Sequence, residues 1–141
     1  GARKCTVPVS SKLSFLLTNS CSLMNKLPEL KSIISLQKPD IIGITETWAH
    51  SFINDAELAL SNYTLFRKDR ANSSGGGCII YVHSKFKPIY LDSSNANSPF
   101  FDITGVVINI GQQTLPIILV YRCPSCTQPE DNRLLQILNR V

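Results

Sequence analysis

The stretch Asp40–Trp48, DIIGITETW, indicates both a buried strand and a candidate functional residue in this 141-residue chain. Its apolar part, Ile41–Ile44, is rich in β-branched side chains, which is typical of a strand covered on both faces. The run ends in Thr-Glu-Thr, so Glu46 lies where the strand leaves the core. Side chains that follow strands of α/β proteins commonly form the active site, and Glu46 is therefore a candidate functional residue.

The residues before this stretch predict a β-α-β unit. Leu13–Thr18 (LSFLLT) forms a short apolar strand, and apolar residues then recur at helical spacing from Leu23 to Ile34. Pro28 is expected in the first turn of this helix, where proline is tolerated. Lys38–Asp40 ends the helix, and a crossover of this length favours parallel strands.

The rest of the chain predicts further strands and helices. A short helix is expected from Asp55 to Leu60, capped by Asn54 or Asp55. We expect two strands joined by a glycine-rich loop, then an antiparallel hairpin with Pro116 at an edge or a bulge of its strand, then a helix from Glu130 onward. These strands are YTLFRKD (63–69), CIIYVH (78–83), FFDITGVVINI (100–110) and TLPIILVY (114–121). The fold class is α/β, with a mixed β-sheet and flanking helices.

The composition indicates one globular domain. The chain is 43% hydrophobic and 17% charged, and its net charge of +4 is compatible with a polyanionic partner without demanding one. No apolar run approaches the roughly 20 residues of a membrane span, and no secretion leader opens the chain, so we expect no membrane partner. Five scattered cysteines without such a leader favour a reduced, intracellular setting.

Two oxygen-bearing side chains follow the first two predicted strands. Asn19 follows the first strand and Glu46 the second. If the strands are parallel neighbours, an amide oxygen and a carboxylate converge at one sheet edge, as suits Mg²⁺. Asn is also a common turn former, and a single Glu after a strand is often only solvated. The spacing alone leaves both interpretations open.

Four longer motifs give further information on the fold and the function. They are TNSCSLMNKLPEL (18–30), KPDIIGITETW (38–48), NYTLFRKDRANSSGGGCIIYV (62–82) and VYRCP (120–124). In this order they resemble motifs of the endonuclease/exonuclease/phosphatase superfamily, most closely the apurinic-type endonuclease domains of LINE-like retrotransposons, which lack long terminal repeats. The resemblance implies half of a four-layer sandwich, and we expect roughly one sheet with helices on one face and the other side uncovered.

The resemblance also implies site residues and a function. Asn19 and Glu46 match metal-site residues for Mg²⁺ or Mn²⁺, and Tyr121 matches a catalytic tyrosine near the scissile phosphate. The implied activity is a metal-dependent phosphodiesterase that nicks DNA and leaves a 3′-hydroxyl to prime reverse transcription. The implied partners are DNA and a reverse transcriptase domain of the same polyprotein, and the implied location of the parent element is the nucleus.

Two later signatures of the superfamily, Asp-x-Asn and Ser-Asp-His, do not occur in this sequence. We therefore expect residues 1–12 to be a leader and residues 13–141 to be the N-terminal portion of the domain, truncated at its C-terminus and inactive alone. His50 and His83 are expected to be ordinary exposed residues. The alternative is a catalytically dead remnant that binds nucleic acid weakly.

Basic and cysteine motifs leave further alternatives open. Arg67, Arg70 and Arg122 could contact DNA phosphates, but the first two could also flank a polar loop and Arg122 could form a structural ion pair. The triple glycine lacks the GK[ST] ending of a nucleotide-binding loop. Cys123 and Cys126 have redox-motif spacing and match half of a zinc knuckle, so a redox or zinc protein is a third hypothesis.

Overall fold

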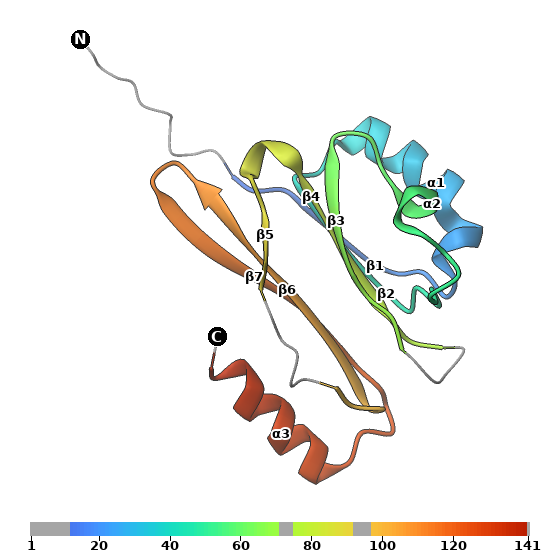
Figure 1. Cartoon of the computed structure of the whole chain (residues 1–141), viewed down its shortest axis with the longest axis vertical. Helices are drawn as coiled ribbons and strands as arrows, with labels where there is room; N and C mark the ends of the chain where they lie inside the picture. The colour runs from blue at the N-terminus through green and yellow to red at the C-terminus, as the bar shows by residue number, and fades with distance from the viewer. Residues whose placement is uncertain (1–11, 71–74, 92–96, 141) are drawn as a thin grey trace.

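The computed structural model describes residues 12–70, 75–91 and 97–140. Nearly all of the predicted leader and residues 71–74 of the glycine-rich loop lie outside these ranges. Two β-sheets face each other, with helices on their outer sides (Figure 1). Sheet A has the order β1 (Phe15–Asn19), β2 (Ile41–Thr45), β4 (Cys78–His83) and β3 (Tyr63–Lys68). Sheet B has the order β5 (Ile89–Leu91), β6 (Phe101–Ile110) and β7 (Gln113–Arg122).

The predicted β-α-β unit is confirmed. β1 and β2 pair in parallel, with Asn19 opposite Thr45, and helix α1 (Leu23–Gln37) connects them. Leu23, Leu27 and Leu30 bury the inner face of α1 against sheet A. The helix ends at Lys38, whose φ of 47° is left-handed.

The expected position of Pro28 is wrong. Because α1 begins at Leu23, Pro28 lies in its second turn, where its missing N–H leaves one helical hydrogen bond unmade. Packing of the apolar face outweighs that loss. Helix α2 (Asp55–Leu58) is shorter than expected and has Asn54 as its cap, with a complete capping box.

The core between the sheets follows from strand alternation. On β4, Ile80 and Val82 point toward sheet B, whereas Ile79 and Tyr81 point toward the helices, and all four are buried. The inward residues pack with Val106, Ile108 and Leu119 of sheet B. β2 is likewise covered on both faces, with Ile41 in the core between the sheets and Ile42 and Ile44 in the core under the helices, as its β-branched composition predicts.

The expectation of one sheet with helices on one face is wrong. The predicted hairpin, β6–β7, forms a second sheet, and its outward residues Phe101 and Ile103 pack with Leu134 of helix α3 (Gln128–Leu138). β6 is buried on both faces, so it separates two cores instead of extending sheet A. β5 was not predicted, because three residues carry too little pattern; a 3₁₀ turn, η1 (Ser84–Phe86), precedes it.

Sheet B does not extend over β1. Phe15 and Leu17, on the inner side of this strand, are 59% and 70% exposed. β7 is an edge strand and carries Pro116, as predicted. The chain is therefore a partial α/β sandwich with an open side. No helix in the described ranges is both long and apolar enough to cross a bilayer.

Candidate functional site

Asn19 and Glu46 leave the same edge of sheet A, as the parallel pairing predicts. Asn19 ends β1 opposite Thr45, and Glu46 directly follows Thr45. The predicted catalytic residue Tyr121 reaches this region from β7 of the other sheet, where it lies opposite Asp102. The structure thus brings all three predicted residues to the end of the molecule where the two sheets meet.

The loop that carries Glu46 has an unusual backbone. Glu46 and Trp48 have left-handed φ angles of 53° and 54°, a conformation that costs a non-glycine residue roughly 1–2 kcal/mol. Backbone hydrogen bonds hold the loop on both sides, among them Ser22 N–H to the Glu46 carbonyl (3.0 Å), Leu23 N–H to the Thr47 carbonyl (2.9 Å) and Trp48 N–H to the Gly76 carbonyl (2.9 Å). Strain that is fixed from both sides is typical of functional sites.

The glycine-rich loop packs against this segment. Gly76 and Gly77 have φ angles of 74° and 86°, and a Cβ on Gly77 would lie 2.6 Å from Thr47 Oγ1. A Cβ on Gly76 would overlap the Arg70 side chain. These glycines are therefore required for close packing around Glu46.

The Glu46 carboxylate is held through one oxygen. Oε2 accepts hydrogen bonds from Trp48 Nε1 at 2.6 Å and from Gly76 N–H at 3.2 Å. Burial raises the pKa of Glu46, but the Trp48 and Gly76 hydrogen bonds, the Tyr121 hydroxyl and the Arg70 charge outweigh burial and lower this pKa below its ordinary value. Glu46 is thus ionised at neutral pH.

The pKa of Tyr121 shifts in the opposite direction to that of Glu46. Burial, the interaction of its hydroxyl with Glu46 and the Glu46 charge raise the pKa of Tyr121 above its ordinary value. The phenol therefore keeps its proton at neutral pH and can donate a hydrogen bond.

Arg70 forms an ion pair across the two sheets. Its Nε and Nη2 donate to Asp102 Oδ1 and Oδ2 at 3.1 and 3.0 Å, and Nη2 also donates to Cys123 Sγ at 3.2 Å. The Asp102 side chain is only 3% exposed and accepts a further bond from Gly77 N–H. Arg70 thus positions the glycine loop, and a phosphate contact would be additional to that function.

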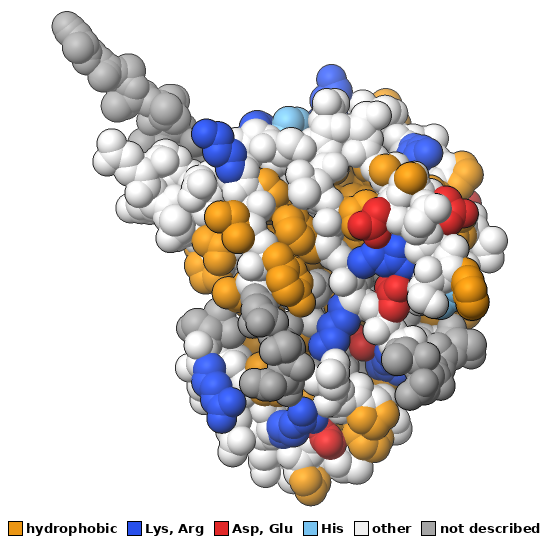
Figure 2. All heavy atoms as spheres, viewed as in Figure 1, with side chains coloured by type: hydrophobic (Ala, Val, Ile, Leu, Met, Phe, Trp, Pro, Cys, Tyr) orange, Lys and Arg blue, Asp and Glu red, His pale blue; other side chains and the backbone are white. Residues whose placement is uncertain are grey.

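The other two predicted phosphate contacts are engaged in local structure. The Arg67 guanidinium binds Asp55, Asp69 and the Ile53 carbonyl. Arg122 points to the outer side of sheet B and pairs with Asp131 of α3 at 2.7 Å. Figure 2 shows basic and acidic side chains interleaved on the visible face instead of a uniform basic surface. Neither arginine therefore adds support for a phosphate site.

The histidines and cysteines have local roles. Nδ1 of His50 accepts from Phe52 N–H, and Nδ1 of His83 accepts from Lys85 N–H. His50 is exposed, as predicted, whereas His83 is half-buried. The Cys123–Cys126 pair forms a turn before α3 as free thiols. Within the described ranges, no group of three or more His, Cys, Asp or Glu side chains could hold a metal ion.

The donor set at the sheet edge fits a hard cation in part. The Trp48 and Gly76 N–H donors both bind Oε2 of Glu46, and Asn19 Oδ1 accepts a thiol hydrogen bond from Cys21. Gly75 has no side chain to cover the carboxylate: a Cβ there would lie 4.0 Å from Oε2. Two oxygen ligands suit Mg²⁺, which binds few protein groups and keeps several waters.

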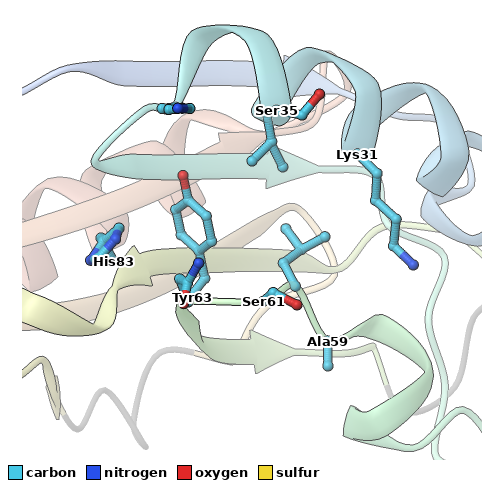
Figure 3. Close-up of a pocket in the computed structure, with 10 residues that line it drawn as sticks. Lys31, Ser35, Ala59, Ser61, Tyr63 and His83 are labelled. Carbon is cyan, nitrogen blue, oxygen red and sulfur yellow. The ribbon is translucent and has the colours of Figure 1, made fainter.

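A pocket of about 550 Å³ lies at the opposite end of sheet A, between α1 and residues 59–62. Figure 3 shows Lys31 and His83 on different sides of it, with Tyr63 between them. The Tyr63 hydroxyl is already bonded to the Pro39 carbonyl. None of the predicted site residues lines this pocket, so pocket size does not coincide with the candidate chemistry.

The fold is that of known nucleases. An apurinic (AP) endonuclease from Leishmania major superimposes with a TM-score of 0.71 at 14% identity, over 91% of this chain and 48% of that one. The endonuclease domain of TRAS1, a telomere-specific non-LTR retrotransposon, gives 0.63 at 15% identity, over 92% and 53%. A humanised D. rerio TDP2 gives 0.62 at 17% identity, over 93% and 56%.

These similarities show the endonuclease/exonuclease/phosphatase fold. This chain spans about half the length of the matched structures. At such identities they show the fold alone. No protein-family model matches the chain, and no curated protein matches it in sequence.

The sequence does not predict the contacts that Trp48 and Asp102 make around Glu46 and Arg70. The ETW motif contains Trp48 but does not indicate that its indole donates a 2.6 Å hydrogen bond to Glu46. Asp102 is an acid inside the apolar run FFDITGVVINI, which is the signal that could have found it. A buried carboxylate in a strand requires a cationic partner, and Arg70 provides it.

Proposed function

We propose that this chain is the metal-binding half of a Mg²⁺-dependent or Mn²⁺-dependent phosphodiesterase that nicks DNA. The observation that carries the proposal is that Asn19 and Glu46 lie at the ends of two neighbouring parallel strands, with the Tyr121 hydroxyl interacting with the Glu46 carboxylate from the other sheet.

Each residue has a role that its chemistry permits. Glu46 would hold the cation through its carboxylate, and Asn19 would orient that carboxylate or coordinate through its amide oxygen. A bound divalent cation supplies charge stabilisation to phosphoryl oxygens and to the leaving 3′-oxygen. Tyr121 would donate a hydrogen bond to a nonbridging phosphate oxygen, most strongly when negative charge develops there.

Two observations support the biological setting that we propose. The ETW and RxDR…GGG motifs resemble the retrotransposon branch of the superfamily, and the TRAS1 endonuclease domain is one of the matched structures. We therefore propose target-site nicking during retrotransposition, DNA as substrate, a reverse transcriptase domain as partner and the nucleus as the location of the parent element.

The chain by itself is proposed to be catalytically incomplete. It contains no Asp-x-Asn and no Ser-Asp-His motif, the parts that bind phosphate and activate water in the superfamily it resembles. The open inner side of β1 supports the same view, because Phe15 and Leu17 there are apolar and exposed. The second candidate function is a remnant that binds nucleic acid weakly without cleaving it.

The test is nicking of supercoiled plasmid with Mg²⁺ and with chelator. It compares the 141-residue chain with the same chain extended by its own downstream coding sequence. In an active extended protein, Glu46→Gln should lower the rate by a factor on the order of 10²–10³, because it removes the charge that holds the cation. Glu29→Gln, an exposed carboxylate on α1, is the matched control and should change nothing.

The isolated 141-residue chain should not nick the plasmid, whether it is unsubstituted or carries Glu46→Gln. If it nicks robustly and Glu46→Gln abolishes that activity, the half-domain interpretation is wrong. If the extended protein binds DNA but never nicks, the remnant function replaces the enzymatic one.

A further inference from the structure

Trp48 is the only tryptophan of the chain, and this residue is 42% exposed beside Glu46. Its indole N–H makes the short 2.6 Å hydrogen bond to Glu46 Oε2. A tryptophan whose role was only to fill the core would be buried, whereas this side chain gives much of its surface to solvent. Its described polar contact is with the carboxylate.

The position of the indole is fixed by the backbone. Trp48 has a left-handed φ of 54°, and its own N–H is bonded to the Gly76 carbonyl. The Gly76 N–H in turn donates to Glu46 Oε2. Two N–H donors, from Trp48 and Gly76, therefore converge on the same carboxylate oxygen.

This convergence has a chemical consequence for the two oxygens of Glu46. Oε2 carries two N–H donors, and neither an indole nor an amide N–H can ligate a cation. Both N–H donors to this carboxylate that the described residues show lie on Oε2, and the Tyr121 hydroxyl interacts with the same carboxylate. The carboxylate is thus divided into a held oxygen and a ligating oxygen.

We propose that Trp48 is a positioning residue: it holds Glu46 by Oε2 so that Oε1 alone binds the divalent cation. This rests on the proposed function, because it assumes that Glu46 is a metal ligand. Groups that orient a metal ligand typically change metal affinity 10-fold to 100-fold when removed. Trp48→Phe keeps an aromatic ring but deletes the donor, so Mn²⁺ should bind at least about 10-fold more weakly.

The experiment measures Mn²⁺ binding to the full 141-residue chain by electron paramagnetic resonance of the free ion. It compares the unsubstituted chain with Trp48→Phe, Glu46→Gln and a matched aromatic control, Phe52→Leu, whose side chain is 90% exposed and contacts the His50 ring. Circular dichroism checks that each variant is folded. The single indole N–H resonance provides a direct readout, because Mg²⁺ should shift it in the unsubstituted chain but not in Glu46→Gln.

Each outcome separates the inference from the function. Loss of binding in Glu46→Gln, weaker binding in Trp48→Phe and no change in Phe52→Leu support the inference. Loss in Glu46→Gln with unchanged or tighter binding in Trp48→Phe overturns the role of Trp48 and leaves the metal site standing. Absence of binding by the unsubstituted chain, or full binding by Glu46→Gln, overturns the metal site and the inference with it.

Discussion

The two ends of sheet A use left-handed backbone differently. At one end, Lys38 ends helix α1 and Asn62 forms the turn before β3, so each left-handed residue belongs to a common cap or turn. At the other end, Glu46 and Trp48 are left-handed within three residues of each other, in a loop bonded on both sides. At that end, N–H donors from Trp48 and Gly76 also converge on one carboxylate oxygen.

The two ends of sheet A differ in the features that suggest a candidate site. The 550 Å³ pocket lies at the Lys38 end, where the polar groups serve the local chain. The Glu46 end shows a strained loop, a carboxylate with lowered pKa and a cross-sheet ion pair. Backbone strain combined with converging donors is the reason for choosing the Glu46 end as the candidate site.

The largest expected effect comes from breaking the buried ion pair at the Glu46 end. Asp102→Ala should lower the free energy of unfolding by about 3–5 kcal/mol, because it leaves Arg70 without its partner. Urea unfolding measures this. Asp55→Ala, which removes an exposed partner of Arg67, should have a much smaller effect. Equal losses in the two variants would show that the cross-sheet pair does not stabilise this end.

The next effect concerns glycine geometry. Gly77→Ala should cost about 2–3 kcal/mol, since left-handed strain adds to a clash with Thr47 Oγ1. Gly111→Ala is the matched control, because Gly111 is also left-handed but has open space around it, and it should cost about 1 kcal/mol. Thermal unfolding of both variants checks the order, and the reverse order would remove the packing argument.

A smaller effect is expected at the opposite end. Tyr63→Phe deletes the hydrogen bond to the Pro39 carbonyl and should cost about 1 kcal/mol of stability. Because the site lies at the other end of the sheet, Mn²⁺ binding should not change. Weaker Mn²⁺ binding in Tyr63→Phe would mean that the two ends are coupled.

The smallest expected effect is on the pH dependence of the free energy of unfolding. Burial raises the pKa of Asp40, but bonds from Ser14 and Lys85 lower it below the ordinary 3.8, and the pKa of Glu46 lies below its ordinary 4.5. A lowered folded-state pKa gives stability that is fully present above the ordinary value and is lost as pH falls through the lower one. Asp40→Asn and Glu46→Gln should each flatten the decline of unfolding free energy between neutral pH and about pH 3.

These two changes should add, since the residues lie at opposite ends of the sheet. Unfolding free energies of the single and double variants across that pH range provide the check. A steeper decline in either single variant would mean that its carboxylate has a raised pKa in the folded chain.

The strands and the β-α-β unit could be predicted because their patterns are local. Alternation and helical spacing identified β1, α1, β2 and the β6–β7 hairpin, and parallel pairing then placed Asn19 and Glu46 at one edge. The second sheet was missed, since no local pattern says whether a hairpin joins an existing sheet or covers it. That choice depends on the shape of the cavity that the other strands leave.

The site was predicted as three residues but not as a network. Asn19, Glu46 and Tyr121 stand at strand ends that a pattern can find. The bonds from Trp48 and Gly76 to Glu46 depend on left-handed φ angles, and the Arg70–Asp102 pair joins residues 32 positions apart. Neither feature leaves a periodic trace in the sequence.

The separation of the two sheets along the sequence has a consequence for how the protein folds during synthesis. All strands of sheet A lie before residue 84, and all strands of sheet B follow it. Sheet A can therefore fold on the ribosome before the later hairpin is synthesised, and its inner face is uncovered until then. The contacts of Arg70 with Asp102 and of Glu46 with Tyr121 both cross between the sheets, so they form last. A nascent chain acquires its candidate site only after the second sheet has docked.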